Sequence, residues 1–231
     1  MSILGAVIVP HPPLIIPTVG RGREQEVQST IDAYQTAAKQ AAAWEPEVLI
    51  ITSPHQIMYV DYFHISPGRG AAGDMSAFGT AQTKLRVEYD APLRDEIIRR
   101  AESADLRVGT LGQRNPYLDH GTFVPLYFLR EAGVDCPILR IGLSGFSPLD
   151  HYLLGQCIAQ AVEALGRKAV FIASGDLSHK LKDDGPYGFA PEGPEFDHQI
   201  TEAMAAGDFL QFLTMDPALC DRAAECGLRS F

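Results

Sequence analysis

The feature that most constrains the fold of this chain is a pattern that occurs three times: an apolar, uncharged run, then a break, then a histidine. Residues 5–9 lead to Pro10 and His11, residues 48–52 to Pro54 and His55, and residues 169–174 to Gly175 and His179. Such runs are typical of strands buried on both faces of a parallel sheet. Ligands of open α/β sheets bind outside the carboxyl ends of the strands. The pattern therefore predicts that three histidines reach one edge of one sheet.

The segments between these runs have the periodicity of helices. Apolar residues recur at helical spacing over residues 27–41, between the first two predicted strands, which predicts a right-handed βαβ unit. Further helices are expected after Asp90, after Thr122 as a capping residue, and from Ser147 to Gly166. We therefore predict an α/β fold, a single domain with a mostly parallel central sheet and helices on both faces.

Length, charge and cysteine content narrow the class of protein. The 231 residues suit one sizeable core, so we expect one catalytic domain over residues 1–231, with its C-terminal end truncated at Phe231. The net charge of −10, without basic runs, argues against a nucleic-acid partner. No apolar run approaches the ~20 residues of a membrane span. Four cysteines without CxxC spacing favour a reduced, cytoplasmic protein.

Neither a dinucleotide-binding motif nor a hydrolase motif explains the function of this chain. Residues 68–73 match GxGxxG, but a strand rather than a helix is expected to follow, so we reject a dinucleotide site. We interpret residues 67–79 as a mobile loop that could close over the crevice. The chain has no GxSxG nucleophile elbow, and Ser178 directly precedes His179, which argues against a hydrolase triad.

His11 and His55 are the first candidates for metal ligands. Either one alone could be an ordinary loop histidine with satisfied hydrogen bonds, but both follow strands of one predicted βαβ unit. Imidazole suits iron, zinc, copper and nickel alike, so the pair predicts a metal site without naming the metal.

His179 lies three residues after Asp176. One interpretation is a turn in which Asp176 caps backbone N–H groups. The other is an acid/base histidine oriented by Asp176, since an ordinary pKa of about 6.5 suits proton transfer near neutral pH. His120, just before a predicted helix, either packs in its loop or lines the crevice. The remaining histidines are interpreted as surface or packing residues: His64, His151 and His198.

A third ligand is sought among carboxylates near the C-terminus. Glu225 is expected in the last turn of its helix, where the helix dipole disfavours a negative charge by about 0.3–1 kcal/mol, so a positive group should lie nearby. Arg229 or Arg222 could supply that charge, and so could a metal ion. Cys226 is the rival ligand, although a free cysteine on an apolar helix face is more often a packing residue.

The motifs taken together resemble a known family, the class III extradiol dioxygenases of the LigB type, which are the catalytic subunits of protocatechuate 4,5-dioxygenase. The resemblance covers nearly the whole chain and is nearest to the Memo branch of the AmmeMemoRadiSam system. It rests on His11-Pro-Pro, Ser-Pro-His55, residues 119–125, residues 175–179, residues 193–197 and the closing Glu225-Cys-Gly227.

The resemblance implies a mononuclear non-haem Fe(II) site with His11, His55 and Glu225 as ligands, which could take up zinc in the isolated protein. It also implies that His179 is the acid/base residue, that His120 lines the pocket, and that O2 opens the ring of a catechol or related aromatic. A homo-oligomer, or a partner subunit or domain, is expected as well. The alternative is a Memo-like metal-binding protein without ring cleavage, in which Cys226 replaces Glu225.

Overall fold

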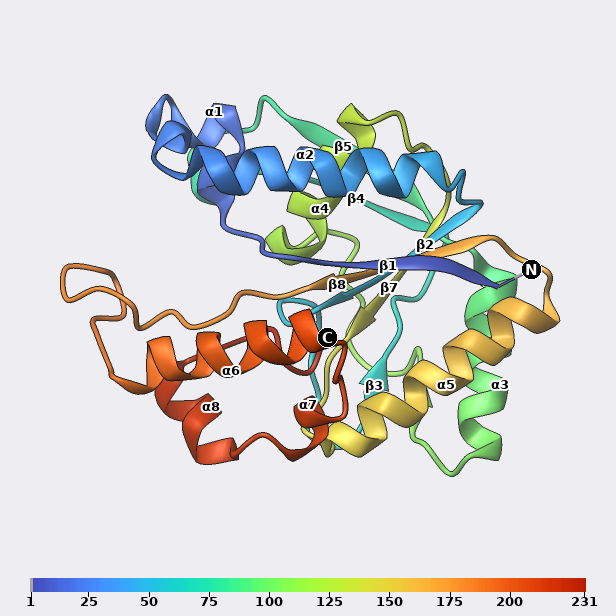
Figure 1. Ribbon diagram of the computed structural model, residues 1–231. Helices are drawn as coiled ribbons and strands as arrows, with labels where there is room; N and C mark the ends of the chain where they lie inside the picture. Colours follow the sequence, from blue (N-terminus) through green and yellow to red (C-terminus); the bar gives the residue numbers. More distant parts are fainter. Residues whose placement is uncertain (1) are drawn as a thin grey trace.

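The computed structural model describes residues 2–231. Its elements along the chain (Figure 1) are β1 (Ile3–Val9), η1 (Pro13–Ile15), α1 (Pro17–Gly20), η2 (Arg23–Val27), α2 (Gln28–Ala43), β2 (Val48–Ser53), β3 (Phe63–His64), β4 (Gly70–Asp74), η3 (Ser76–Phe78), β5 (Lys84–Glu88), α3 (Ala91–Ser103), β6 (Val108–Gly109), α4 (His120–Glu131), β7 (Ile138–Gly142), α5 (Pro148–Ala164), β8 (Ala169–Ser174), α6 (Glu192–Ala206), α7 (Gln211–Thr214) and α8 (Pro217–Ala223).

A four-stranded parallel sheet, in the order β1-β8-β2-β7, forms the centre of the molecule (Figure 1). The register pairs Val9 with Ser174 and Thr52 with Ala173, so β1, β8 and β2 end at the same level. Every residue of β2 is buried, as its apolar run predicted. The predicted mostly parallel sheet is confirmed, and the strand ends that precede the three histidines lie side by side.

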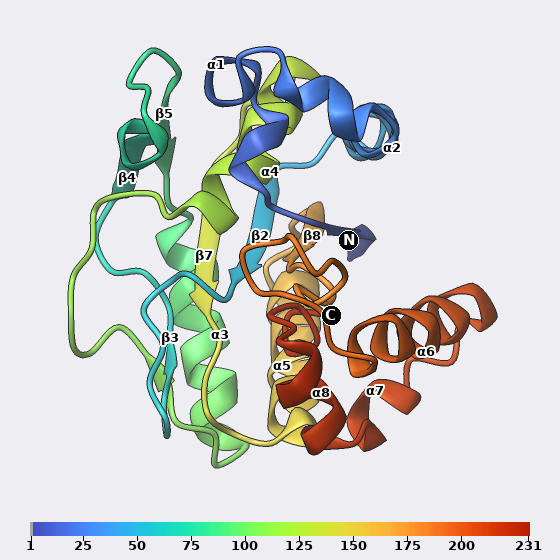
Figure 2. The same ribbon diagram turned by 90° about the vertical axis from the view of Figure 1, so that its left-hand side faces the viewer.

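Helices cover both faces of this sheet, which confirms the predicted layers (Figure 2). On one face α2 and α4 pack together, and the rings of Tyr34 and Phe128 stack with their centroids 4.3 Å apart. On the other face α3 and α5 share a second apolar cluster with the sheet. A third cluster joins α6 and α8. Within residues 2–231, none of the helices has the length and hydropathy that crossing a bilayer requires.

Residues 67–79, predicted to form a mobile loop, contain a strand instead. β4 pairs antiparallel with β5. A side chain at Gly70 would collide with the Val87 carbonyl, and a Cβ at Gly73 would lie 2.9 Å from Leu118 Cβ. The loop prediction was wrong because these glycines, which usually weaken a strand, are needed here for close approach of neighbouring segments.

Two helix boundaries also differ from the prediction. α4 begins at His120, and its N-cap is Asp119, whose Oδ1 accepts a hydrogen bond from the Thr122 N–H at 3.0 Å, so Thr122 is not the cap. α8 ends before Ala224, which turns into the left-handed region at φ 53°. Glu225 therefore lies beyond the helix, and the expected unfavourable helix-dipole interaction does not apply to it.

Candidate metal centre

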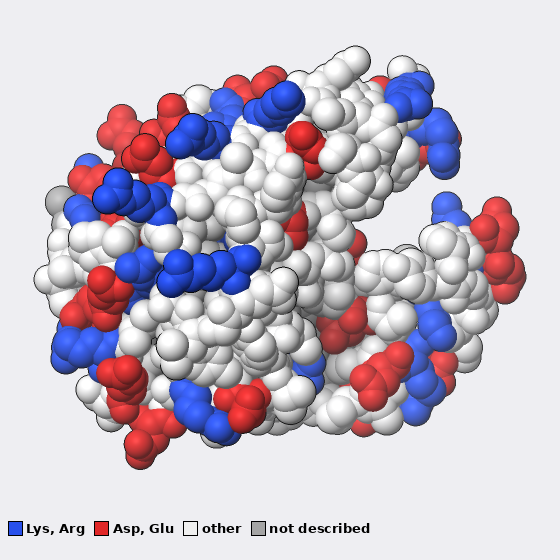
Figure 3. Space-filling view, turned by 180° about the vertical axis from the view of Figure 1, so that it is seen from behind, with Lys and Arg blue, Asp and Glu red and all other residues white. Residues whose placement is uncertain are grey.

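Segments that follow three of the central strands meet at the carboxyl edge of the sheet. His11 follows β1, His55 follows β2, and Asp176 and His179 follow β8. From behind, the molecule is hollowed on this side, between the part containing α1 and α2 and the part containing α6 to α8 (Figure 3). His11 itself is buried at this edge, whereas Asp176 and His179 are partly exposed.

The hydrogen bonds of His11 fix its tautomer. His11 is only 1% exposed, and its Nδ1 lies 2.9 Å from Ser174 Oγ. The Ser174 hydroxyl donates its one proton to the Gly121 carbonyl at 2.5 Å, so it must accept the hydrogen bond from His11 Nδ1–H. His11 Nε2 is therefore the unprotonated nitrogen, which is the arrangement that outer hydrogen bonds give to metal-binding histidines.

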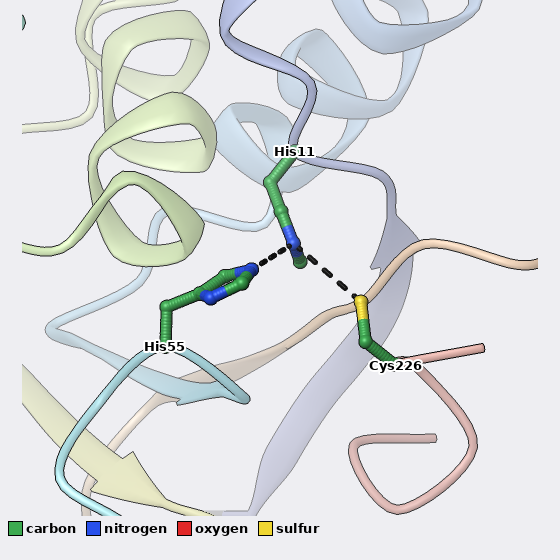
Figure 4. A group of neighbouring side chains, drawn as sticks. All are labelled: His11, His55 and Cys226. Atoms are coloured by element: carbon green, nitrogen blue, oxygen red, sulfur yellow. Dashed lines mark hydrogen bonds between the residues drawn. The ribbon is translucent and has the colours of Figure 1, made fainter. Parts of the chain in front are cut away.

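Two further possible metal-donor atoms lie beside this nitrogen (Figure 4). His55 Nε2 lies 3.0 Å and Cys226 Sγ lies 3.7 Å from His11 Nε2. An ion bound by imidazoles at about 2.0–2.1 Å and a thiolate at about 2.3 Å, at angles of about 90–115°, would hold the nitrogens roughly 2.9–3.4 Å apart and nitrogen and sulfur roughly 3.1–3.7 Å apart. These two distances fit donors that share one metal ion, and all three donor atoms lie within 4.8 Å of one another.

Asp176 connects His11 to His179. Its Oδ1 accepts the His11 backbone N–H at 2.8 Å, and its Oδ2 lies 3.6 Å from His11 Nε2 and 3.5 Å from His179 Nε2. His179 Nδ1 is 2.6 Å from the Ala224 carbonyl, which can only accept, so Nδ1 carries a proton. The predicted convergence of residues 11, 55 and 179 at one sheet edge is therefore observed.

The environments of the four histidines separate them into two kinds. Burial lowers the pKa of His55, and it lowers the pKa of His11 and of His120 to about 4, so these rings are neutral near pH 7. The hydrogen bond with Asp176 raises the pKa of His179 instead. Neutral imidazole is the form that binds metals, whereas a histidine that takes up a proton readily suits acid/base work.

Asp176 remains the charged partner of this group. Burial alone would raise the pKa of the Asp176 carboxyl, but hydrogen bonds from His179 and from the His11 backbone, together with the charges of both imidazoles, hold it below its usual value. A carboxylate is therefore present at neutral pH beside the one site histidine whose pKa is raised.

Aromatic rings form two walls of the crevice. The His120 ring lies 3.9 Å from that of His55 and 5.4 Å from that of His11, between centroids, so His120 lies beside both candidate ligands. Phe78, on η3, places its ring 5.2 Å from His120. Tyr187, in the loop before α6, lies 4.9 Å from the His179 ring.

Glu225 is placed differently from the expectation. Its carboxylate accepts the Leu228 N–H at 2.7 Å, and burial raises its pKa. In the part of the chain that the structure describes, the donor group around His11 and His55 is completed by Cys226, and Glu225 is not among its members. Burial raises the pKa of the Cys226 thiol to about 12, so this thiol is protonated unless a cation lies beside it.

The other three histidines lie where they were interpreted to be. His64 is fully buried in β3, and the His151 ring packs 4.7 Å from the Phe63 ring. His198 is exposed on α6, 3.4 Å from Glu202. Each of the three has a packing or surface position.

The fold and the donors define a class of protein, an α/β protein with two imidazoles and a thiol gathered as possible metal ligands at the carboxyl edge of a parallel sheet. Residues 5–231 match the family model described as the catalytic LigB subunit of aromatic ring-opening dioxygenase. The chain therefore belongs to this family, as its motifs predicted.

Individual relatives have related names. The chain is 34% identical, over 100% of its length, to protein CA_C1420 of Clostridium acetobutylicum, of which it spans about half (51%). It is 26% identical to a 2-aminophenol 1,6-dioxygenase beta subunit of a Pseudomonas species, with 96% of this chain and 80% of that protein covered. It is 28% identical to a 2,3-dihydroxyphenylpropionate/2,3-dihydroxicinnamic acid 1,2-dioxygenase of Escherichia coli, with 68% and 51% covered.

A solved structure shares the fold. The uncharacterized protein JW3007 from Escherichia coli K12 superposes with a TM-score of 0.56 at 14% identity, over 85% of this chain and 79% of that one. At this identity the likeness concerns the fold alone, which agrees with the predicted α/β class.

Sequence reasoning missed part of the centre. Ser174 was not singled out, although it is the last residue of β8 and so had to lie at the functional edge. Asp119 was noted only within a motif, although an aspartate directly before the first residue of a helix is a typical N-cap. Cys226 was considered only as a rival to Glu225.

Proposed function

We propose that the protein is an Fe(II)-dependent extradiol dioxygenase that opens the ring of a catechol or a related aromatic with O2. The observation that carries the proposal is the pair of imidazole donors of His11 and His55, 3.0 Å apart, directly beside the Asp176–His179 pair, in a chain of the LigB family. Metal ligands and an acid/base residue are the two components that such a reaction needs.

His11 and His55 would hold the metal ion, and Cys226 or Glu225 would supply a third ligand. When bound, a ferrous ion would offer adjacent open positions at which an aromatic diol and O2 can meet. The tautomer that Ser174 imposes on His11 supports this role, since Nε2 already presents a lone pair. The low pKa of His11, about 4, means that no proton has to leave its ring before a cation binds near pH 7.

His179 would take a proton from the substrate hydroxyl and return it later in the reaction. Its Nδ1–H is committed to the Ala224 carbonyl, so only Nε2 can exchange a proton with a bound molecule. Asp176, 3.5 Å from that nitrogen, would stabilise the imidazolium that forms. The raised pKa of His179 agrees with a group that accepts a proton near neutral pH.

The aromatic walls support a planar ring as substrate. Phe78 lies beside His120 and Tyr187 beside His179, so the two rings stand against different histidines of the crevice. Aromatic pairs prefer offset or edge-to-face contact, which a flat substrate between these walls can make. The names of the relatives suggest a catechol, a carboxylated catechol or an aminophenol as the first compounds to try.

A second candidate function is a metal-binding protein without ring cleavage. It is favoured by one observation, the position of Cys226 Sγ 3.7 Å from His11 Nε2 while the Glu225 carboxylate bonds to Leu228. Two imidazoles and a thiolate are more typical of zinc than of Fe(II) oxygenases, which use two histidines and a carboxylate. The identity of the third ligand thus separates the two functions.

The deciding experiment loads chelator-treated protein with Fe(II) or Zn(II) under anaerobic conditions and then adds O2 with catechol, a carboxylated catechol or 2-aminophenol. The proposal expects O2 uptake and a ring-opened product with Fe(II) alone, lost in His55→Ala and kept in His198→Ala, whose imidazole is on the surface. Metal binding without O2 uptake for any compound would favour the second function. Glu225→Gln and Cys226→Ser, compared in metal affinity, identify the third ligand.

A partner and a location complete the proposal. A relative is named as a beta subunit, so we expect this chain to associate with a partner subunit or with a second copy of itself. Light scattering coupled to gel filtration would show the mass of the assembly. The cytoplasmic location expected from cysteine usage stays a prediction.

A further inference from the structure

Arg140 is a fully buried arginine in the middle of an apolar strand. It belongs to β7, whose other residues are Ile138, Leu139, Ile141 and Gly142, and its side chain is 0% exposed. Burying a charged group is costly unless it is paired and hydrogen-bonded. An arginine retained at such a position therefore indicates a specific role for its guanidinium.

The guanidinium connects β7 to two separate segments, one containing Ser66 and the other residues 115–119. Nη2 donates to the Asn115 carbonyl and Nη1 to the Tyr117 carbonyl, each at 2.6 Å, and Nε donates to Ser66 Oγ at 2.8 Å. Nη1 also lies 3.6 Å from Asp119 Oδ2. The flat, rigid fork of an arginine suits several fixed partners at once, which a lysine cannot match.

One of these partners positions His120. Asp119 is the N-cap of α4, and His120 is the first residue of that helix. The Asp119 carboxylate accepts the Thr122 N–H at 3.0 Å and the Thr122 hydroxyl at 2.8 Å. Arg140 Nη1, which is 3.6 Å from Oδ2 of this carboxylate, therefore forms an ion pair at the end of α4 where His120 lies.

Two further contacts lead to His55. Ser53 Oγ donates to Asp119 Oδ1 at 2.5 Å and accepts the His55 backbone N–H at 3.2 Å. On the other side of the turn, Ser66, which Arg140 also contacts, bonds to the side-chain amide of Gln56. The residues on both sides of His55 are therefore connected to Arg140.

We propose that Arg140 is a positioning residue, which through Asp119, Ser53 and Ser66 sets the places of His55 and His120 at the metal centre. The inference rests on the proposed function only in that it takes His55 for a metal ligand. A purely structural ion pair would stabilise the fold without affecting the affinity for metal. The two roles therefore predict different results.

The experiment measures the affinity for Zn²⁺ by competition with a chelator, together with the urea midpoint of unfolding. Arg140→Met should weaken Zn²⁺ binding by about 10–100-fold, the usual loss when an outer contact of a metal ligand is removed. Leu93→Ala, a substitution at a fully buried residue of α3, should lower the unfolding midpoint without affecting Zn²⁺ binding. Arg140→Lys keeps the charge but loses the planar guanidinium group, so the affinity of this variant for Zn²⁺ should stay below that of the wild type.

Ser53→Ala provides a milder variant if Arg140→Met does not fold. It removes the link from Asp119 to the His55 turn and leaves Arg140 in place, so Zn²⁺ affinity should again fall. Its control is Ser144→Ala, another fully buried serine. Wild-type affinity in Arg140→Met or in Ser53→Ala would overturn the inference.

Crystal structures of the variants supply a readout that is independent of catalysis. We expect displaced imidazoles of His55 and His120 in Arg140→Met, and unchanged positions would overturn the positioning role. If the wild type binds Zn²⁺ but opens no aromatic ring with Fe(II), the proposed function fails. The Zn²⁺ affinities of the variants still test the positioning role of Arg140 in that case. If ring opening is found and the variants bind metal as the wild type does, only this inference fails.

Discussion

The Nε2 atoms of His11 and His55 lie 3.0 Å apart, although the two residues are 44 positions apart in the chain. The parallel register of β1, β8 and β2 is the cause, since it ends the three strands at one level and turns the following residues into the same hollow. β8 lies between the two strands that lead to the histidines; it ends with Ser174, and Asp176 follows two residues later at the same edge. The candidate centre is thus a direct product of the sheet topology.

Replacing Ser174 by alanine should weaken metal binding. Without the hydroxyl, His11 Nδ1–H loses its acceptor and the ring is no longer held with its Nε2 lone pair toward the centre. We expect about a 10–100-fold loss of Zn²⁺ affinity in a chelator competition. Ser144→Ala serves as the matched control, and equal affinities in the two variants would contradict the role of Ser174.

Replacing His179 by glutamine should affect turnover and leave metal content unchanged. A general acid/base residue contributes about 10²–10⁴-fold to rate, so kcat for a catechol should fall within this range. His198→Gln, on the exposed side of α6, should behave as the wild type. A His179→Gln variant with wild-type kcat would show that another group moves the proton.

The pH dependence of turnover provides a separate test of His179. The hydrogen bond with Asp176 raises the pKa of His179 above 6.5, and the substrate proton can be accepted only by the neutral ring. The acidic limb of kcat/KM should therefore have its midpoint above pH 6.5 and should disappear in His179→Gln. A limb that persists in the variant would assign the titration to a different group.

Stability of the chelator-treated protein should fall in mild acid. Burial lowers the pKa of His11 and of His120 from 6.5 to about 4, so between these values the unfolded chain binds more protons than the folded one. The stabilisation from these neutral rings is therefore fully present above pH 6.5 and is lost as the pH falls toward 4. His11 contributes about 3 kcal/mol of it, and the raised pKa of His179 offsets part of the loss. Urea midpoints measured from pH 7.5 to 4.5 check this, and a flat profile would contradict it.

Phe78→Ala should weaken substrate binding more than it slows turnover. The ring stands beside His120, which is not a member of the candidate donor group. Loss of one aromatic contact, worth about 0.5–1.5 kcal/mol, corresponds to roughly a 2–10-fold rise in KM. Phe209→Ala, a similarly exposed phenylalanine between α6 and α7, is the control, and an unchanged KM in Phe78→Ala would remove this wall from the site.

The convergence of the histidines was accessible from sequence because it depends on strong local signals. Uncharged apolar runs ended by proline or glycine identify buried parallel strands, and their ends must share an edge. Helix starts with a clear capping residue were also predicted correctly, as at Asp90 and Ser147. These features depend on a few neighbouring residues and not on distant contacts.

Which of Glu225 and Cys226 lies beside the two histidines could not be predicted, because it depends on where α8 stops. The helix ends before Ala224, whose left-handed backbone redirects the next residues, so that Cys226 faces His11 and Glu225 bonds to Leu228. If the end of α8 shifted by one or two residues, Glu225 rather than Cys226 could point toward His11. The pattern of apolar residues does not fix helix ends to that accuracy.

The sequence contains a feature from which buried partners of Arg140 could have been predicted. A charged residue between Leu139 and Ile141, in a run otherwise typical of a buried strand, had to find buried partners. Its partners lie on segments far along the chain, at Ser66 and at Asn115 to Asp119, so only the assembled fold shows which ones they are.

The most direct test of the metal centre is an anomalous-scattering map from crystals grown with the metal that the protein retains. The account predicts one strong peak within about 2.0–2.3 Å of Nε2 of both His11 and His55, and its loss in His55→Ala. A map without a peak there, with the two imidazoles still hydrogen-bonded to each other, would contradict it.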